Sequence, residues 1–124
     1  MVLKTLLDTN AILYLLGGCL VEPLEPGEYF ASVITEIELL SYPSLNVEAE
    51  RQIRALLSEI GLVELTPPIR NTAIQLRRQY ELKVPDAIIA GTALVLDAEI
   101  LTNDPHLLRI PGLRGRSLRL KGSS

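Results

Sequence analysis

Short apolar segments alternate with longer helical patterns along this chain. The short segments have the length and composition of buried strands, and they are Val2 to Leu7, residues around Tyr29 to Ala31, Leu62 to Leu65, Glu99 to Leu101 and Leu118 to Leu120. Strands that alternate with helices favour right-handed crossovers and a mainly parallel sheet covered by helices on both faces. The pattern therefore predicts an α/β fold whose functional site lies at the carboxyl ends of the strands.

Five helices are predicted between these strands. They cover Ala11 to Leu16, Ser32 to Ser41, a segment capped by Asn46 and ended by Gly61, a segment from Pro67 or Pro68 to about Glu81, and Asp86 to Leu96. The fourth helix has a clear apolar face of Ile69, Ala73, Leu76 and Tyr80, with Arg70, Arg77 and Arg78 outward. The segment from Gly17 to Glu28, rich in Gly and Pro, is predicted to be a loop.

The composition fits one folded unit. With 124 residues and 48% hydrophobic content, the chain has enough apolar material for one core, and we expect a single domain over residues 1–124. Its apolar runs fall far short of the ~20 residues that a membrane span needs, and the start lacks a signal-peptide pattern. A lone Cys19 suits a reducing compartment, so we expect a cytoplasmic protein without membrane contact.

The net charge of −3 is unevenly distributed. Residues 1 to 104 carry 15 acids and 7 bases, a net −8, whereas residues 105 to 124 carry five bases and no acid: Arg109, Arg114, Arg116, Arg119 and Lys121. Such a basic tail could hold a phosphate backbone, or it could be a solvated terminal strand. The mean hydropathy of +0.27 indicates, in addition, an apolar face that could contact another subunit.

Four acids occupy positions where strands end or helices begin. Asp8 and Asp104 follow apolar strands, and Asp86 opens the most apolar helix beside Pro85. Glu36 lies four residues after Ser32, the expected cap of its helix, and is therefore predicted to border the core. Ile34, Ile37 and Leu40 would form the packed stripe of this helix, while Glu38 would be solvated.

Each of these acids, taken alone, has a simpler explanation as a helix cap or a first-turn residue favoured by the helix dipole. In a parallel sheet, however, all four positions lie at the same edge. If they converge, carboxylates within a few ångströms repel one another unless a cation is present. Oxygen ligands without His or Cys at ligand spacing favour Mg²⁺ or Mn²⁺ over zinc, and such a site could hydrolyse a phosphodiester.

The motifs around these acids resemble those of the PIN domain, and especially of the VapC toxins of bacterial toxin–antitoxin pairs. They are Leu-Leu-Asp8-Thr9-Asn10, Ser32-Val-Ile-Thr35-Glu36, Pro85-Asp86-Ala87, and Leu-Thr102-Asn103-Asp104 followed by Arg-Ile-Pro-Gly-Leu at 109–113. The similarity covers nearly the whole chain, in order and at suitable spacing. It implies a three-layer α/β/α sandwich with a central five-stranded, mainly parallel sheet.

The resemblance also implies an endoribonuclease that depends on Mg²⁺ or Mn²⁺. By family role, Asp8, Glu36, Asp86 and Asp104 would hold the metal and the attacking water. Asn10, Ser32 and Thr102 would orient these carboxylates by hydrogen bonds, and Thr35 could act like Ser32. The implied partners are an RNA substrate, a small antitoxin that covers the catalytic groove, and a second copy of the chain in a homodimer.

One position departs from the family pattern. Many relatives carry another acid two residues after the position of Asp104, where this chain has His106. The departure leaves open a site with one metal ion. His106 could contact substrate phosphate or the metal, or it could be a polar residue in a short helical turn.

Two other functions compete with the ribonuclease. A PIN fold could hold RNA or a protein partner without cutting, although all four acids are present. Asp8 could instead be a phosphorylated nucleophile at a strand end, as in receiver domains or haloacid-dehalogenase-like phosphatases. The sequence fits these poorly, because receivers need an acidic pair near the first strand and the phosphatases need a second Asp where Asn10 stands.

Overall fold

The computed structural model describes residues 3–122 and contains one five-stranded sheet. Its strands are β1 (Lys4–Leu7), β2 (Glu28–Ser32), β3 (Gly61–Val63), β4 (Glu99–Leu101) and β5 (Gly115–Arg116). They lie in the order β3-β2-β1-β4-β5, and every neighbouring pair is parallel. The carboxyl ends of all five strands therefore share one edge. The predicted parallel α/β fold is confirmed, with Val2 of the first predicted strand outside the described residues.

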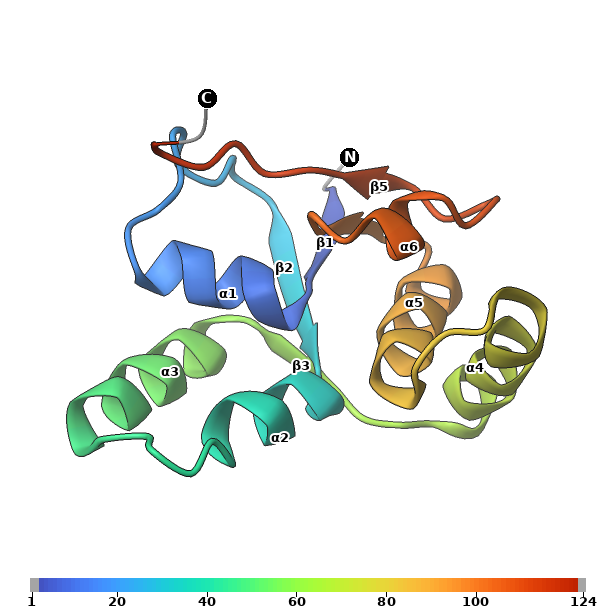
Figure 1. Cartoon of the computed structure of the whole chain (residues 1–124), viewed down its shortest axis with the longest axis horizontal. Coiled ribbons are helices and arrows are strands. Elements are labelled where there is room, and N and C mark those ends of the chain that lie inside the picture. The colour runs from blue at the N-terminus through green and yellow to red at the C-terminus, as the bar shows by residue number, and fades with distance from the viewer. Residues whose placement is uncertain (1–2, 123–124) are drawn as a thin grey trace.

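Helices cover both faces of this sheet (Figure 1). They are α1 (Thr9–Leu16), α2 (Val33–Leu40), α3 (Val47–Glu59), α4 (Pro67–Tyr80), α5 (Val84–Leu96) and the short α6 (Pro105–Leu108). Figure 1 shows α1, α2 and α3, in blue to green, on one side of the strands and α4 and α5, in yellow to orange, on the other. The arrangement is the predicted three-layer α/β/α sandwich.

Alternation along the strands produces two hydrophobic cores. Leu6 and Ile100 point toward α4 and α5, whereas their neighbours Leu7 and Leu101 point toward α1 and α3. Each of these four side chains is at most 1% exposed. Because successive side chains of a strand point to opposite faces, this burial on both sides fixes the register of β1 and β4. The carboxyl ends of these two strands are thereby held in the middle of the edge that all five carboxyl ends share, which we call the functional edge.

A close helix pair supports one side of the sandwich. α4 packs on α5 through Ile69, Ala73 and Leu76, as its sequence pattern predicts. Gly91 of α5 allows the approach, because a Cβ atom there would lie 3.2 Å from the carbonyl oxygen of Ile69. The pair runs antiparallel, so the C-terminal end of α4 lies near the first turn of α5.

Several boundaries differ from the sequence prediction, and two of these differences change the start of β3 and the position of β5. Gly61 is not the stop of α3 but the first residue of β3, since Ile60 is already extended. The last strand is Gly115–Arg116 rather than Leu118 to Leu120. Leu118 instead packs against the core on the α1 side, and Leu120 forms an isolated antiparallel bridge with Leu20. The alternating leucines of the tail therefore reflect packing and not pairing with β4. Within the described chain, no helix is long and apolar enough to cross a membrane.

Candidate active site at the carboxyl edge

Asp8 lies at the centre of the functional edge, directly after β1. Its side chain is 6% exposed, and its Oδ1 accepts a hydrogen bond of 2.7 Å from the backbone amide of Ala11. Asp8 is thus the N-cap of α1, the simpler role that the sequence also allowed. The cap uses one carboxylate oxygen and holds the side chain at the edge of the sheet.

Asp104 reaches the same edge from β4. Its Oδ1 caps the short α6 by accepting from the amide of His106 at 2.9 Å. Thr102, fully buried, accepts a hydrogen bond of 3.0 Å from the amide of Asp104 and donates to the Asp8 carboxylate. Thr102 therefore lies between the Asp8 carboxylate and the backbone of Asp104, and its role in orienting the carboxylates stays a prediction.

Asp86 comes from the other layer, in the first turn of α5 after Pro85. It is half-buried, and the charges of Asp104, Glu38 and Asp8 all act on it. A helix from one layer and loops from the central strands thus bring three of the four predicted acids together. Their joint placement at one edge is the feature that helix capping alone does not require.

The fourth carboxylate of this cluster is Glu38, not Glu36. The hydroxyl of Thr9 donates to Glu38 Oε1 at 2.7 Å, and the charge of Glu38 acts on both Asp8 and Asp86. Glu36 lies instead beside Arg54, Ser58 and other residues of a separate surface hollow between α2 and α3.

The correction has a physical cause in the rotation of α2. Thr35 and Leu39 are its buried residues, whereas Ile37, predicted in the packed stripe, is 54% exposed. Ser32 does not indicate which face of α2 points to the cluster, because its hydroxyl accepts a hydrogen bond from the Ile34 amide within the cap itself. Glu38 is three residues after Thr35 and therefore shares its face.

A chain of hydroxyl groups orients Glu38. The Thr9 and Thr35 Oγ1 atoms are 3.1 Å apart, and the single hydroxyl proton of Thr9 is used toward Glu38. Thr35 must then donate to Thr9, so the order is Thr35 to Thr9 to Glu38. Thr35 is fully buried, while Glu38 is exposed. The sequence analysis missed Thr9 in this role; its place directly after Asp8 was the one signal that the sequence offered.

The electrostatics of the cluster favour a bound cation. Burial raises the pKa of the Asp8 carboxyl, with Asp104 and Glu38 adding to the rise and hydrogen bonds from Thr102 and the Ala11 amide opposing it. Burial also raises the pKa of Asp86; the neighbouring acids add to the rise, and Lys83 opposes it. Within residues 3–122, no three His, Cys, Asp or Glu side chains already stand in ligating geometry. Carboxylates gathered at one edge repel one another unless a cation compensates their charges.

The remaining predicted residues differ in their contacts. Ser32, 1% exposed, caps α2 and holds the start of that helix. Asn10 is exposed, and among residues 3–122 its side chain has no hydrogen bond to a carboxylate. His106 is exposed, with Nδ1 3.2 Å from Asp104 Oδ1. Of the two interpretations left open for His106, the structure shows a residue in a helical turn that also contacts a cluster acid.

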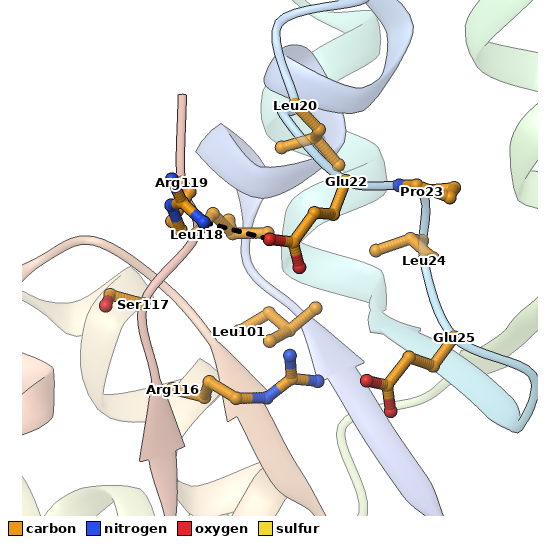
Figure 2. Close-up of a pocket in the computed structure, with 10 residues that line it drawn as sticks. All are labelled: Leu20, Glu22, Pro23, Leu24, Glu25, Leu101, Arg116, Ser117, Leu118 and Arg119. Atoms are coloured by element: carbon orange, nitrogen blue, oxygen red, sulfur yellow. Dashed lines mark hydrogen bonds and ion pairs between the residues drawn. The ribbon is translucent and has the colours of Figure 1, made fainter. Parts of the chain in front are cut away.

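The basic tail is folded against the acidic body rather than projecting from it. Arg114 is paired with Asp97 at 3.0 Å and Arg116 with Glu99 at 2.6 Å. Figure 2 shows the next contact, in which Arg119 reaches Glu22 of the loop between α1 and β2 at 3.0 Å. A cavity of about 190 Å³ lies between the loop and the tail, lined on one side by Leu24 and on the other by Leu118. Three of the five tail cations are thus engaged with carboxylates.

Asn103 anchors the tail next to the acid cluster. Its side-chain amide donates to the carbonyl oxygen of Leu118 at 3.2 Å, and its Oδ1 accepts from the Leu118 amide at 2.7 Å. Because Asn103 precedes Asp104, this double contact ties the loop that carries Asp104 to the C-terminal segment.

An apolar groove of about 520 Å³ opens beside the cluster between α1, α2 and α3. Thr9 and Glu38 form part of its wall, and the remainder is mostly apolar, including Leu13, Leu39, Tyr42, Leu45 and Ile53. Leu13 and Tyr42 are 48% and 65% exposed. A large accessible apolar surface next to charged groups is typical of a site that another molecule covers.

The fold and site together define an α/β/α protein with an acidic cluster at the carboxyl edge of a parallel sheet. A family model of the PIN domain matches residues 5–113, and the chain belongs to the PIN domain family. No curated protein sequence matches the chain significantly.

Solved structures with the same fold come from toxin–antitoxin complexes. A chain of VapBC2 from Rickettsia felis, bound to a promoter DNA fragment, has a TM-score of 0.78 and 19% identity, covering 93% of this chain and 98% of that one. A chain of DNA-bound VapBC from Salmonella typhimurium has a TM-score of 0.76 and 23% identity, with 93% and 98% covered. A toxin–antitoxin complex from Klebsiella pneumoniae gives 0.72 and 27%, with 88% and 94% covered.

Proposed function

We propose that this protein is a metal-dependent endoribonuclease and the toxin of a toxin–antitoxin pair. The observation that carries the proposal is the convergence of Asp8, Glu38, Asp86 and Asp104 from four different segments on one edge of the sheet. In this proposal Glu38 takes the catalytic and metal-binding role that the sequence analysis gave to Glu36. The PIN family membership and the likeness to chains of toxin–antitoxin complexes support the class of function.

The donor set fits Mg²⁺ or Mn²⁺. All four candidate ligands are carboxylates, and the lone Cys19 and His106 do not form a softer set with them. A bound divalent ion would supply charge neutralisation at the phosphodiester and a more acidic water. With His106 in place of the further acid of many relatives, the set suits one ion.

The protein's own side chains would hold and orient the metal-binding carboxylates. Thr102 fixes Asp8 relative to Asp104, and the Thr35–Thr9 pair fixes Glu38. The pKa values of Asp8 and Asp86 are raised because burial and neighbouring acids disfavour the charged forms, and a bound cation would compensate these charges. Water that lies between Asp86 and Asp104 could lose its proton to either carboxylate, because both are partly accessible.

The apolar groove beside Glu38 suits the antitoxin. A partner segment with apolar side chains could fill the hollow of about 520 Å³ and extend over Thr9 and Glu38, closing the acid cluster. Such a contact would silence the enzyme without altering its catalytic groups. The toxin would act on cellular RNA, and we therefore place it in the cytoplasm.

We also propose that the free protein forms a homodimer. Ile37 on α2 and Leu62 on the edge strand β3 are 54% and 37% exposed, next to a hollow lined by Glu36 and Arg54. Apolar side chains together with one acid and one base form a self-complementary patch, as a two-fold contact requires. Ile37→Glu should convert the dimer into a monomer in sedimentation experiments, and an unchanged sedimentation coefficient would locate the contact elsewhere.

The ribonuclease is tested by incubating purified protein, freed of any bound inhibitor, with mixed cellular RNA. Cleavage should require Mn²⁺ or Mg²⁺, stop with EDTA, and be lost in Asp8→Asn/Asp86→Asn. Absence of cleavage by the wild type under these conditions would contradict the enzyme and favour a PIN fold that binds RNA or protein without cutting.

A further inference from the structure

The basic residues of the chain fall into two groups when their ion pairs are considered. Five arginines contact carboxylates of the body: Arg51, Arg54, Arg114, Arg116 and Arg119. The described residues include another group without such a partner, concentrated between positions 70 and 83: Arg70, Arg77, Arg78 and Lys83. All four of these side chains are exposed. Their charges are therefore available to an external anion.

This second group lies on a part of the chain that is almost free of acids. α4 carries three arginines and no acid, and Glu81, just after its end, is the one acid from Leu65 to Pro85. The remainder of the body is acidic, so the α4 surface differs in sign from its surroundings. Clustered cations of this kind hold phosphate backbones and account for much of the affinity of nucleic-acid-binding proteins.

The geometry of α4 arranges these cations along a line. Arg70 and Arg77 are two turns apart on the same face, about 10 Å along the helix axis at 1.5 Å per residue. Both line a shallow apolar hollow of about 230 Å³ between α4 and α5, together with Ile74 and Val84. A guanidinium can bind a phosphate through two hydrogen bonds and can also stack on a base.

Lys83 connects this line to the acid cluster. It immediately precedes α5, three residues before Asp86, and it lies close enough for its charge to oppose the rise in the pKa of that carboxyl. The antiparallel packing of α4 on α5 places the C-terminal end of α4, with Arg77 and Arg78, at this same end of the hairpin. A polyanion held on α4 would thus approach the cluster past Lys83.

We propose that the α4–α5 hairpin is the phosphate-binding surface for single-stranded RNA, with Arg70, Arg77, Arg78 and Lys83 as its contacts. The inference rests on the proposed ribonuclease and adds to it the surface that holds the substrate. The acid cluster by itself repels a polyanion, and three of the four tail arginines are occupied by carboxylates. Within residues 3–122, the hairpin carries a cluster of four exposed cations for which no ion pair is formed, and it lies next to the acid cluster.

The test measures RNA binding separately from cleavage. A labelled single-stranded RNA of mixed sequence is titrated in EDTA, with every protein in the Asp8→Asn background. Arg77→Glu/Arg78→Glu should weaken binding at least tenfold. Arg70→Gln/Arg77→Gln/Lys83→Gln should lower the slope of log affinity against log salt by about 2, since each phosphate contact on a single strand contributes roughly 0.7.

Arg51→Glu/Arg114→Glu is the matched control, because these two arginines are also exposed but paired with Glu48 and Asp97. It should change the affinity by less than about twofold if local pairing cancels these charges. Equal urea midpoints would verify that the variants are folded. An equal loss in the control and hairpin variants, or no loss in either, overturns the hairpin surface.

Two further outcomes separate this surface from the proposed function and from a protein partner. RNA binding that depends on the hairpin, in a protein that never cleaves RNA, supports the surface and contradicts the ribonuclease. If poly-L-glutamate binding, but not RNA binding, falls in the hairpin variants, the surface belongs to an acidic protein partner and the RNA proposal is overturned.

Discussion

The hydroxyl chain from Thr35 through Thr9 to Glu38 makes a quantitative prediction about stability. Thr9→Val removes two hydrogen bonds at once, the one to Glu38 and the one from Thr35. The bond to Glu38 is accessible to water and should be worth only about 1 kcal/mol. The loss of the acceptor for Thr35 is more serious, because Thr35 is fully buried and its unpaired hydroxyl should cost about 1–3 kcal/mol. The single variant should therefore lose about 2–4 kcal/mol.

Replacing both threonines should recover most of that loss. In Thr9→Val/Thr35→Val no unpaired hydroxyl remains in the core, so only the bond to Glu38 is missing. The double variant should be about 1–3 kcal/mol more stable than Thr9→Val. Thr35→Val alone should cost less than about 1 kcal/mol, since Thr9 still donates to Glu38.

Urea unfolding of the four proteins measures this cycle. With a slope of roughly 2 kcal/mol per M, the difference between Thr9→Val and the double variant corresponds to about 0.5–1.5 M in the midpoint. Simple addition of the two single effects, without recovery in the double variant, would refute the hydroxyl chain. The same proteins report on function: RNA cleavage should fall in Thr9→Val and stay low in the double variant, because Glu38 is released in both.

Three other predictions concern the acid cluster and its anchor. Mg²⁺ or Mn²⁺ should raise the melting temperature of the wild type, and Asp8→Asn should abolish this rise. The metal-free variant should be at least as stable as wild type, because Asn keeps the helix cap and removes a repelling charge. A thermal scan in which the metal still raises the melting temperature of the variant would contradict the site. The folded pKa values of Asp8 and Asp86 lie above their ordinary value of 3.8, so their contribution to the stability of the metal-free protein is complete below that pH and is lost as pH rises through the folded values. Urea midpoints followed upward from that pH should show this loss in wild type and a smaller one in Asp8→Asn/Asp86→Asn, and equal losses would contradict it. Asn103→Ala removes both bonds to Leu118 and should cost about 1–3 kcal/mol with faster amide exchange over the tail, whereas unchanged exchange there would show that the anchor is dispensable.

The sheet and most of the site could be predicted because they follow from local chemistry. Asp8 and Asp104 come directly after buried apolar strands, and Asp86 follows Pro85 at the start of an apolar helix. In a parallel sheet these positions converge whatever the details of packing. The inward face of α4 was equally readable, since its apolar residues repeat every three or four positions and no polar residue interrupts them.

The features that the sequence did not reveal depend on tertiary contacts. The rotation of α2 is set by a buried threonine, Thr35, which pairs with Thr9 from another helix. Apolar periodicity suggested the stripe of Ile34 and Ile37 instead, and so the sequence analysis selected Glu36, which lies outside the cluster. The ion pairs of the tail were also hidden, because three of its arginines pair with acids that lie up to 97 residues away in the chain. The net charge of a segment does not reveal which acids its arginines contact in the folded protein.

A comparison of variants at Glu36 and Glu38 provides the most direct test of the proposed site. Both glutamates lie on α2, two residues apart, and Glu→Gln changes each by one charge with the same shape. RNA cleavage in Mn²⁺ should fall at least a hundredfold in Glu38→Gln and by less than about threefold in Glu36→Gln, because only Glu38 would bind the metal or hold one of its ligands in place. Cleavage lost in Glu36→Gln and retained in Glu38→Gln would contradict the four-carboxylate site described by this structure.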